Sequence, residues 1–242
     1  MLTLVMPFYG NPGMLALQYR NWAGWAEKRR NRLKVIIIDD GSPEPAADVA
    51  RPEGVEIEIY RVLEDRPWHQ HAARNLGADR APEGWLLLTD MDHVLTDEAA
   101  RILFKRMDAG QLAEGAVYML DRVEADTGEP TMQNGKPKPH PNSFVMTRAT
   151  YWRIGGYDED YCGVYGTDGL FKERAFRIAR KAHLQVPLTR YWRDIVPDAS
   201  TRTLARKEGR DPGAKKRIAA AKAARGEADT IKVLQFPWER VI

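Results

Sequence analysis

Only one cysteine, Cys162, occurs among the 242 residues of the chain. This excludes a disulfide within the chain, because two cysteines are needed to form one. A protein without disulfides is suited to a reducing compartment. We therefore expect a cytoplasmic protein.

Long apolar runs are also missing. A membrane-spanning helix needs about 18 consecutive apolar residues or more, whereas the longest apolar candidates, Val35–Ile38 and Trp85–Leu88, have the length of a strand. The N-terminus lacks the basic region of a signal peptide and leads directly into a strand-like segment. The sequence thus predicts neither a transmembrane segment nor a secretory leader.

Charge of one sign is not in large excess. The net charge is +3, so composition alone does not imply a nucleic-acid partner. Hydrophobic residues make up 43% of the chain, which is enough for one sizeable core. One large α/β domain is therefore the expected organisation.

Short apolar runs alternate with amphipathic segments over residues 1–110. Strands are expected at Leu2–Met6, Val35–Ile38, Val55–Tyr60 and Trp85–Thr89, and helices at Met14–Arg30, Trp68–Arg80 and Asp97–Ala109. This alternation is typical of a mostly parallel sheet covered by helices. Ligands of such sheets bind outside the carboxyl ends of the strands.

The pattern changes after residue 120. Glycines and prolines interrupt Asp121–Asn142, which predicts a long mobile loop near the site. Ordered structure is expected to resume at Ser143–Met146, followed by a helix at Asp168–Lys181 and a short strand at Leu184–Leu188. Thr201–Arg225 is rich in arginine, lysine and alanine and predicts a basic helix or helix pair.

Two carboxylates, Asp90 and Asp92, follow an apolar strand that directs both to the same strand end. Two such acids can bind one hard divalent cation that bridges two phosphates, because Mg²⁺ and Mn²⁺ prefer carboxylate, phosphate and water oxygens. His93 follows directly and could add an imidazole ligand. The alternative is a surface turn, since the Asp-x-Asp pattern is common by chance.

Three further positions carry polar groups suited to chemistry. Asp39 and Asp40 close the second strand, where an acid can accept hydrogen bonds from a nucleobase or a ribose, unless they form a plain turn. Arg74 could contact a pyrophosphate or clamp an aspartate of the metal site. Asp168 begins a helix, whose dipole favours the ionised carboxylate that a general base for a sugar hydroxyl requires. An N-cap role for Asp168 is compatible with this.

Six short motifs follow one another along the chain. They are Val5-Met6-Pro7-Phe8-Tyr9, Ile36-Ile37-Ile38-Asp39-Asp40-Gly41-Ser42, Ala73-Arg74-Asn75-Leu76-Gly77, Leu88-Thr89-Asp90-Met91-Asp92, Gly155-Gly156-Tyr157-Asp158-Glu159 and Gly166-Thr167-Asp168. In this order they resemble the motifs of family 2 of the GT-A-fold glycosyltransferases, over about three-quarters of the chain.

The resemblance implies a GT-A (Rossmann-like) α/β fold, in which helices sandwich a mostly parallel sheet. Residues 1–195 would form one catalytic domain, with a nucleotide-binding half at 1–110 and an acceptor half at 111–195. Residues 196–242 would form a basic helical C-terminal extension.

The resemblance also implies an inverting displacement that uses a nucleoside-diphosphate sugar, with a UDP-sugar as the expected donor, and Mn²⁺ or Mg²⁺ as cofactor. It assigns roles by position: Pro7, Tyr9 and Asp39 to the nucleoside, Arg74 to the diphosphate region, Asp90 to the ribose or sugar, Asp92 to the metal and Asp168 to the base.

The sequence departs from the family pattern in two respects. Thr167 stands where the family usually has an acid, immediately before Asp168. The Gln-x-x-Arg-Trp motif of processive members is absent, which favours a single transfer. A non-catalytic nucleotide-sugar or glycan-binding module is the alternative. A nucleotidyltransferase ranks lower, because the Tyr9–Gly13 loop has no lysine or arginine.

Three classes of acceptor stay open: a polysaccharide or lipid-linked glycan, a protein, and DNA with hydroxymethylated bases. The cytoplasm of a bacterial or phage-infected cell suits these acceptors. A basic stretch near the C-terminus could follow a phosphate backbone or lie against anionic lipid, or it could be a solvated helical face. Its residues are Arg202, Arg206, Lys207, Arg210, Lys215, Lys216, Arg217, Lys222 and Arg225.

Overall fold

The computed structural model describes residues 1–199, 211 and 213–242. The strands are β1 (Leu2–Phe8), β2 (Leu33–Asp39), β3 (Glu56–Val62), β4 (Trp85–Leu88), β5 (His93–Val94), β6 (Ala116–Glu124), β7 (Met132–Gln133), β8 (Lys136–Pro137), β9 (Phe144–Thr147), β10 (Arg180–Arg190) and β11 (Trp238–Arg240). The α-helices are α1 (Pro12–Ala23), α2 (Glu27–Arg30), α3 (Gln70–Arg80), α4 (Asp97–Asp108), α5 (Arg148–Ile154), α6 (Asp168–Ile178) and α8 (Ala214–Ala224).

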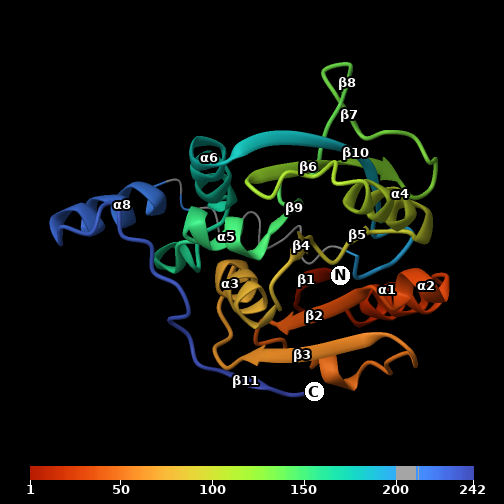
Figure 1. The fold of residues 1–242 in the computed structure, drawn as a ribbon. Coiled ribbons are helices and arrows are strands. Elements are labelled where there is room, and N and C mark those ends of the chain that lie inside the picture. Colours follow the sequence, from red (N-terminus) through yellow and green to blue (C-terminus); the bar gives the residue numbers. More distant parts are fainter. Residues whose placement is uncertain (200–210, 212) are drawn as a thin grey trace.

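A central sheet joins nine of these strands in the order β11-β3-β2-β1-β4-β9-β6-β10-β5 (Figure 1). Strands β3, β2, β1 and β4 are parallel to one another, and β6 is parallel to β10. Strand β9 is antiparallel to both β4 and β6, so β6 and β10 run in the same direction as β1 and β4. The mostly parallel α/β sheet is confirmed, and the carboxyl ends of these strands share one edge.

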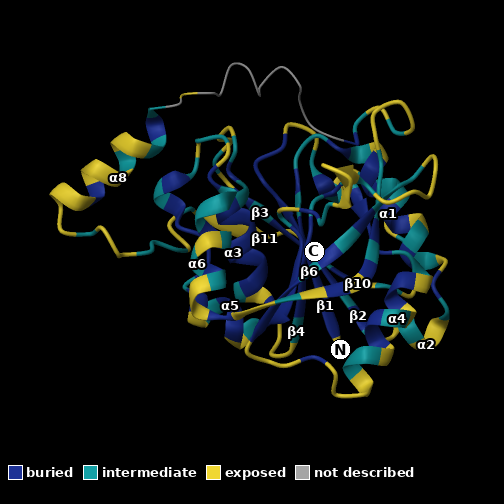
Figure 2. Ribbon diagram, turned by 90° about the horizontal axis from the view of Figure 1, so that it is seen from above, coloured by how far each residue is buried: buried dark blue, intermediate teal, exposed yellow. Residues whose placement is uncertain are grey.

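Each face of the sheet has its own apolar core, because side chains of a strand alternate between the faces. On one face, Leu4 and Met6 pack in a cluster with residues of α1 and α4, such as Trp22 and Leu103. On the other face, Val5 belongs to a cluster with residues of α3, α5 and α6. The buried strands lie at the centre of the molecule, between these helices (Figure 2).

Helix α3 lies so close to the sheet that one position requires glycine. A Cβ atom on Gly77 would lie 2.2 Å from Cγ1 of Val5 on β1. Helix α3 thus packs against β1 and β2, and Arg74, earlier on the same helix, reaches Asp90 in the segment after β4.

Several predicted boundaries were wrong. The helix expected at Met14–Arg30 is divided into α1 and α2, which Gly24–Ala26 separate. The loop expected at Asp121–Asn142 begins instead with the last residues of β6 and contains the hairpin β7–β8. The helix expected to reach Lys181 ends at Ile178, and β10 already begins at Arg180. Pairing of β6 with β10 stabilises both strands beyond what their own residues favour.

The C-terminal segment returns to the domain. Helix α8 stands beside the main body, and the chain after it runs back along the sheet (Figure 1). Its end forms β11, which pairs antiparallel with the edge strand β3. The predicted basic residues at 202–210 lie outside the described residues. No helix in the described part of the chain has the length and apolar character to cross a membrane.

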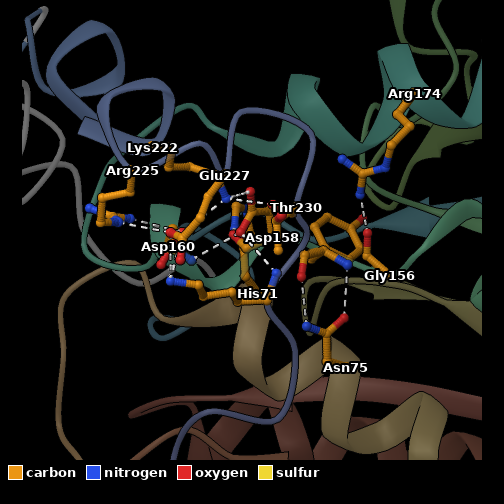
Figure 3. Close-up of polar contacts among 12 residues, drawn as sticks. His71, Asn75, Gly156, Asp158, Asp160, Arg174, Lys222, Arg225, Glu227 and Thr230 are labelled. Carbon is orange, nitrogen blue, oxygen red and sulfur yellow. Dashed lines mark hydrogen bonds and ion pairs between the residues drawn. The ribbon is translucent and has the colours of Figure 1, made fainter. Parts of the chain in front are cut away.

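Helix α8 is attached through Lys222, whose ammonium group is buried (Figure 3). It lies 2.6 Å from Asp158 Oδ2 and 2.9 Å from Asp160 Oδ2, and it donates a 2.7 Å hydrogen bond to the carbonyl of Thr230. Asp158 is also mostly buried, so Lys222 neutralises a carboxylate that water reaches poorly.

Replacing Lys222 with methionine should therefore destabilise the protein. Removal of one partner of a buried ion pair leaves the other charge uncompensated and costs about 3 kcal/mol or more. Urea unfolding should show this loss relative to wild type. The exposed Lys216 on the same helix provides the matched control, Lys216→Met. Equal stability of the two variants would contradict the structural role of Lys222.

Candidate active site

A cavity of about 490 Å³ opens at the carboxyl edge of the sheet. Five of the seven predicted site residues line it: Pro7, Tyr9, Asp90, Asp92 and Asp168. The tertiary structure thus brings together side chains from β1, the segment after β4 and the start of α6. Asp39 and Arg74 are not among the lining residues.

Asp39 shapes the turn after β2. Its Oδ1 accepts a 2.8 Å hydrogen bond from the Ser42 amide, and its Oδ2 accepts one of 2.9 Å from the Ala46 amide. Arg61 lies 3.0 Å from the same Oδ2. Both carboxylate oxygens are therefore engaged within the protein. The neighbouring Asp40 lines the cavity instead.

Asp40 faces His69, with Oδ1 3.3 Å from Nδ1. Burial, together with the charges of Asp39 and Asp65, raises the pKa of Asp40 well above its usual value. Burial lowers the pKa of His69 to about 4. Desolvation disfavours the charged form of each group, so this end of the cavity suits a ligand edge that forms neutral hydrogen bonds.

Aromatic side chains border the same end of the cavity. Phe8, Tyr9, Trp68 and Tyr165 all line it. The rings of Trp68 and Tyr165 are 4.6 Å apart, and the Tyr9 hydroxyl donates a 3.0 Å hydrogen bond to Asp65. Flat rings beside polar groups are suited to a ligand that is itself a flat ring.

Asp90 is held by two basic side chains. Arg74 donates to its Oδ1, and Nε2 of His140 lies 3.5 Å from its Oδ2. Arg74 is fully buried and also donates to the carbonyl of Asn142 at 3.1 Å. Of the two predicted contacts of Arg74, the structure thus contains the one with an aspartate, and this contact fixes the orientation of Asp90.

Asp92 lines the cavity as well. Its Oδ1 lies 2.7 Å from Nδ1 of His93, and its backbone carbonyl accepts a 2.9 Å hydrogen bond from Tyr191. The ring of His93 stacks on that of His140, with centroids 3.6 Å apart.

The described residues contain no group of three or more histidine, cysteine, aspartate or glutamate side chains that could hold a metal ion. A site built mainly from one carboxylate fits Mg²⁺ or Mn²⁺ when the remaining ligands are phosphate oxygens and water. Asp92 is the residue that fits this position, because it borders the cavity and, unlike Asp90, forms no ion pair with an arginine of the described residues.

Asp168 is the first residue of α6, and Thr167 occupies the N-cap position in its place. The side-chain amide of Gln70 donates to Oδ1 of Asp168. Nε2 of His71 lies 3.9 Å from the same oxygen and 3.3 Å from Thr167 Oγ1. The carboxylate is therefore positioned by side chains from the start of α3 and borders the cavity.

The segment before α6 is tied to α3 through Asn75 (Figure 3). Asn75 accepts a 2.8 Å hydrogen bond from the Tyr157 amide and donates bonds of 2.7 Å to the Tyr157 carbonyl and to Glu159. Arg174 of α6 donates to the Gly156 carbonyl. These contacts fix α6, and with it Asp168, relative to the helix that carries Arg74.

Some cavity residues were not among the predicted site residues. Arg122, His140, Lys172 and Arg190 line the cavity. Arg122 and His140 fall in the segment that was expected to be a loop, and Arg190 lies beyond the end of the predicted strand. The apolar residues that precede Arg122 were the only available signal for a strand there. His183 lies 2.8 Å from Asp121 and is not among the cavity residues.

Comparison with known proteins identifies the family and the fold of the chain. The model of glycosyl transferase family 2 matches residues 3–165. No curated protein sequence is significantly similar to the chain.

Solved structures of the same fold include TarS from S. aureus, with a TM-score of 0.63, 13% identity and coverage of 93% of this chain and 39% of that one. TarS 1–349 from S. aureus in complex with UDP-GlcNAc has a TM-score of 0.61, 13% identity and coverage of 90% and 65%. The mannosyltransferase PcManGT from Pyrobaculum calidifontis, in complex with GDP-Man and Mn²⁺, has a TM-score of 0.61, 15% identity and coverage of 93% and 64%. The chain thus spans less than two thirds of the length of each.

Proposed function

The chain belongs to glycosyl transferase family 2, and from this premise we propose that it transfers a sugar from a nucleoside-diphosphate sugar to an acceptor hydroxyl. The observation that carries the proposal is the meeting of Asp92, the Asp90–Arg74 pair and Asp168 at one cavity. These residues come from three separate segments, and together they supply a metal ligand, a fixed donor contact and a base.

The nucleoside binds at the end of the cavity formed by Pro7, Tyr9 and the Asp40–His69 pair. Asp40 takes the direct contact that the family motif suggests for Asp39, because Asp39 uses its oxygens to hold the turn. The aromatic rings nearby support stacking of the base. UDP is the proposed nucleotide, and the UDP-GlcNAc complex of a structure with the same fold is consistent with it.

The diphosphate binds next to Asp92, together with Mn²⁺ or Mg²⁺. When bound, the cation neutralises negative charge that develops on the leaving diphosphate. Asp92 provides the protein ligand, and Arg74 orients Asp90 toward the ribose or sugar. Arg74 itself lies behind Asp90 and acts on the donor through that carboxylate.

Asp168 accepts the proton of the acceptor hydroxyl as the hydroxyl oxygen attacks the anomeric carbon. The bond from that carbon to the diphosphate oxygen breaks at the opposite face, so a single displacement inverts the configuration. Gln70 holds the carboxylate in place for this step. The proposed reaction is a single transfer, and a glycan or a hydroxymethylated DNA is the proposed acceptor.

A thermal-shift screen of nucleotide sugars, each with and without Mn²⁺, tests donor binding, because a ligand that binds only the folded state raises its melting temperature. We expect UDP with Mn²⁺ to stabilise the protein more than the sum of the separate effects, since the protein offers the metal mainly one carboxylate. Release of free sugar from the bound donor should then report catalysis. Donor binding without turnover would favour a binding module, and absence of binding would contradict the donor site.

A further inference from the structure

Arg122 is a mostly buried cation that forms no direct ion pair with the described residues, and the charges of Glu124 and Asp92 act on it from farther away. The residue is 7% exposed and borders the cavity, and its Nε atom has no hydrogen-bond partner. Burial, and secondarily the charge of Arg190, lowers the pKa of Arg122. A buried charge without a partner is costly unless something else compensates it. A bound anion would supply that compensation.

The register of the sheet places Arg190 beside Arg122. Arg122 on β6 pairs with Leu188 on β10, and Arg190 lies two residues beyond Leu188, so both arginines lie on the same face. Asp121, adjacent in sequence, lies on the opposite face and contacts His183. The guanidinium of Arg190 lies over the ring of Trp192, 3.3 Å from its centroid, which holds the side chain in position.

Lys172 adds a third positive charge from the helical side of the cavity. It lies one turn after Asp168 on α6, so the two side chains share a face of the helix. No hydrogen bond or ion pair joins Lys172 to another residue of the described part. Arg122 and Arg190 thus line the cavity from two paired strands, where Glu124 lies 3.7 Å from Arg190, and Lys172 lines the same cavity from α6.

This region is separate from the nucleoside end of the cavity. Asp40 follows β2 and Pro7 lies on β1, on one side of β4, whereas β6 and β10 lie on the other side. One strand, β9, separates β4 from β6, so Arg122 lies roughly 10 Å across the sheet from the end of β4. The two arginines therefore lie beside Asp92 and away from the nucleoside end, because Arg190 pairs with His93 on β5 and the Tyr191 amide donates a hydrogen bond to the Asp92 carbonyl.

We propose that Arg122, with Arg190 and Lys172, binds a carboxylate or phosphate group that one of the substrates carries in addition to the donor diphosphate. The inference rests on the proposed function and extends it, because it makes one substrate anionic on the sugar side. The planar fork of an arginine binds either anion through two parallel hydrogen bonds. The anion has two candidate sources: a carboxylate on the donor sugar, or a charged group on the acceptor.

The test compares wild type with Arg122→Met and Arg122→Lys by calorimetry in the presence of Mn²⁺. UDP alone should bind wild type and Arg122→Met with equal affinity. UDP-glucose carries a hydroxymethyl group where UDP-glucuronic acid carries a carboxylate. The difference between their affinities therefore reports whether the site binds a carboxylate of the donor sugar. Inorganic phosphate added to the UDP-loaded protein reports an anion from the acceptor. Arg177→Met, at an exposed position on α6 outside the cavity, is the matched control.

A donor-sugar site predicts that wild type prefers UDP-glucuronic acid by about 10- to 100-fold, that Arg122→Met loses this preference and that Arg122→Lys keeps part of it. An acceptor site predicts no such preference but a phosphate affinity that Arg122→Met loses. In either case Arg122→Met without ligand should be at least as stable as wild type, because it removes an uncompensated charge.

Three results would overturn the proposal. The first is an equal loss of affinity for UDP itself in Arg122→Met, which would assign the arginine to the diphosphate. The second is that wild type and Arg122→Met bind UDP-glucuronic acid with equal affinity and also bind inorganic phosphate with equal affinity. The third is a marked loss of stability in Arg122→Met, which would make the residue structural. UDP binding by the wild-type protein in any of these cases leaves the proposed function intact, so the two failures are distinguishable.

Discussion

Replacing Asp92 with asparagine should abolish the Mn²⁺-dependent part of nucleotide binding and leave the fold intact. The amide oxygen of asparagine carries no charge and is a poor ligand for a hard cation. No group of three metal-binding side chains in the described residues can compensate. Loss of a residue that supports a metal ligand costs about 10- to 100-fold in affinity, and loss of the ligand itself should cost at least as much.

Calorimetry with UDP, with and without Mn²⁺, measures this effect. Asp229→Asn is the matched control, because Asp229 is exposed and does not line the cavity. A thermal melt should show that both variants stay folded, although Asp92→Asn changes the contact with His93. Unchanged Mn²⁺–UDP affinity in Asp92→Asn would refute the assignment of the metal site.

Replacing Asp168 with asparagine should leave donor binding unchanged and reduce transfer by about 10²- to 10⁴-fold, the usual contribution of a general base. Asparagine has nearly the same shape as aspartate, so Gln70 can still hydrogen-bond to the side-chain oxygen. The amide cannot accept the proton of the acceptor hydroxyl. The expected loss is therefore in the chemical step.

Single-turnover transfer, measured beside UDP binding, separates the two effects once an acceptor is identified. Glu173→Gln is the control, because it neutralises an exposed acid on the same helix. Undiminished transfer in Asp168→Asn would mean that another group is the base. The nearby acids Asp158 and Glu159 are poorly placed for this role, because Lys222 and Asn75 bind them and neither lines the cavity.

Local sequence was sufficient to predict the strands that lead to the site. The apolar runs before Asp39 and Asp90 form β2 and β4, and the carboxyl ends of both lie at the same edge of the sheet. Apolar runs bounded by turn residues reflect local preferences, so they were readable without knowledge of the rest of the chain. The family followed from the order of the motifs, and the family model confirms it.

Contacts between segments far apart in the chain could not be predicted from local sequence. Strand β6 could not be predicted beyond Leu120, because its polar end is stabilised by pairing with β10, about 60 residues later in the chain. The same limitation hid Arg122 and Arg190 as cavity residues. Strand β11 likewise depends on β3, from which it is separated by most of the chain.

The sequence by itself thus determined the α/β class, the family and the position of Asp90 and Asp92 after one strand end, whereas the tertiary structure brings Asp168 to the same cavity. The tertiary structure decided which polar groups are available to a ligand. It engages Asp39 in the turn, leaves Asp40 at the cavity wall and joins Arg74 to Asp90. The physical reason is that strand formation depends on neighbours in sequence, whereas the availability of a polar group depends on its partners in space.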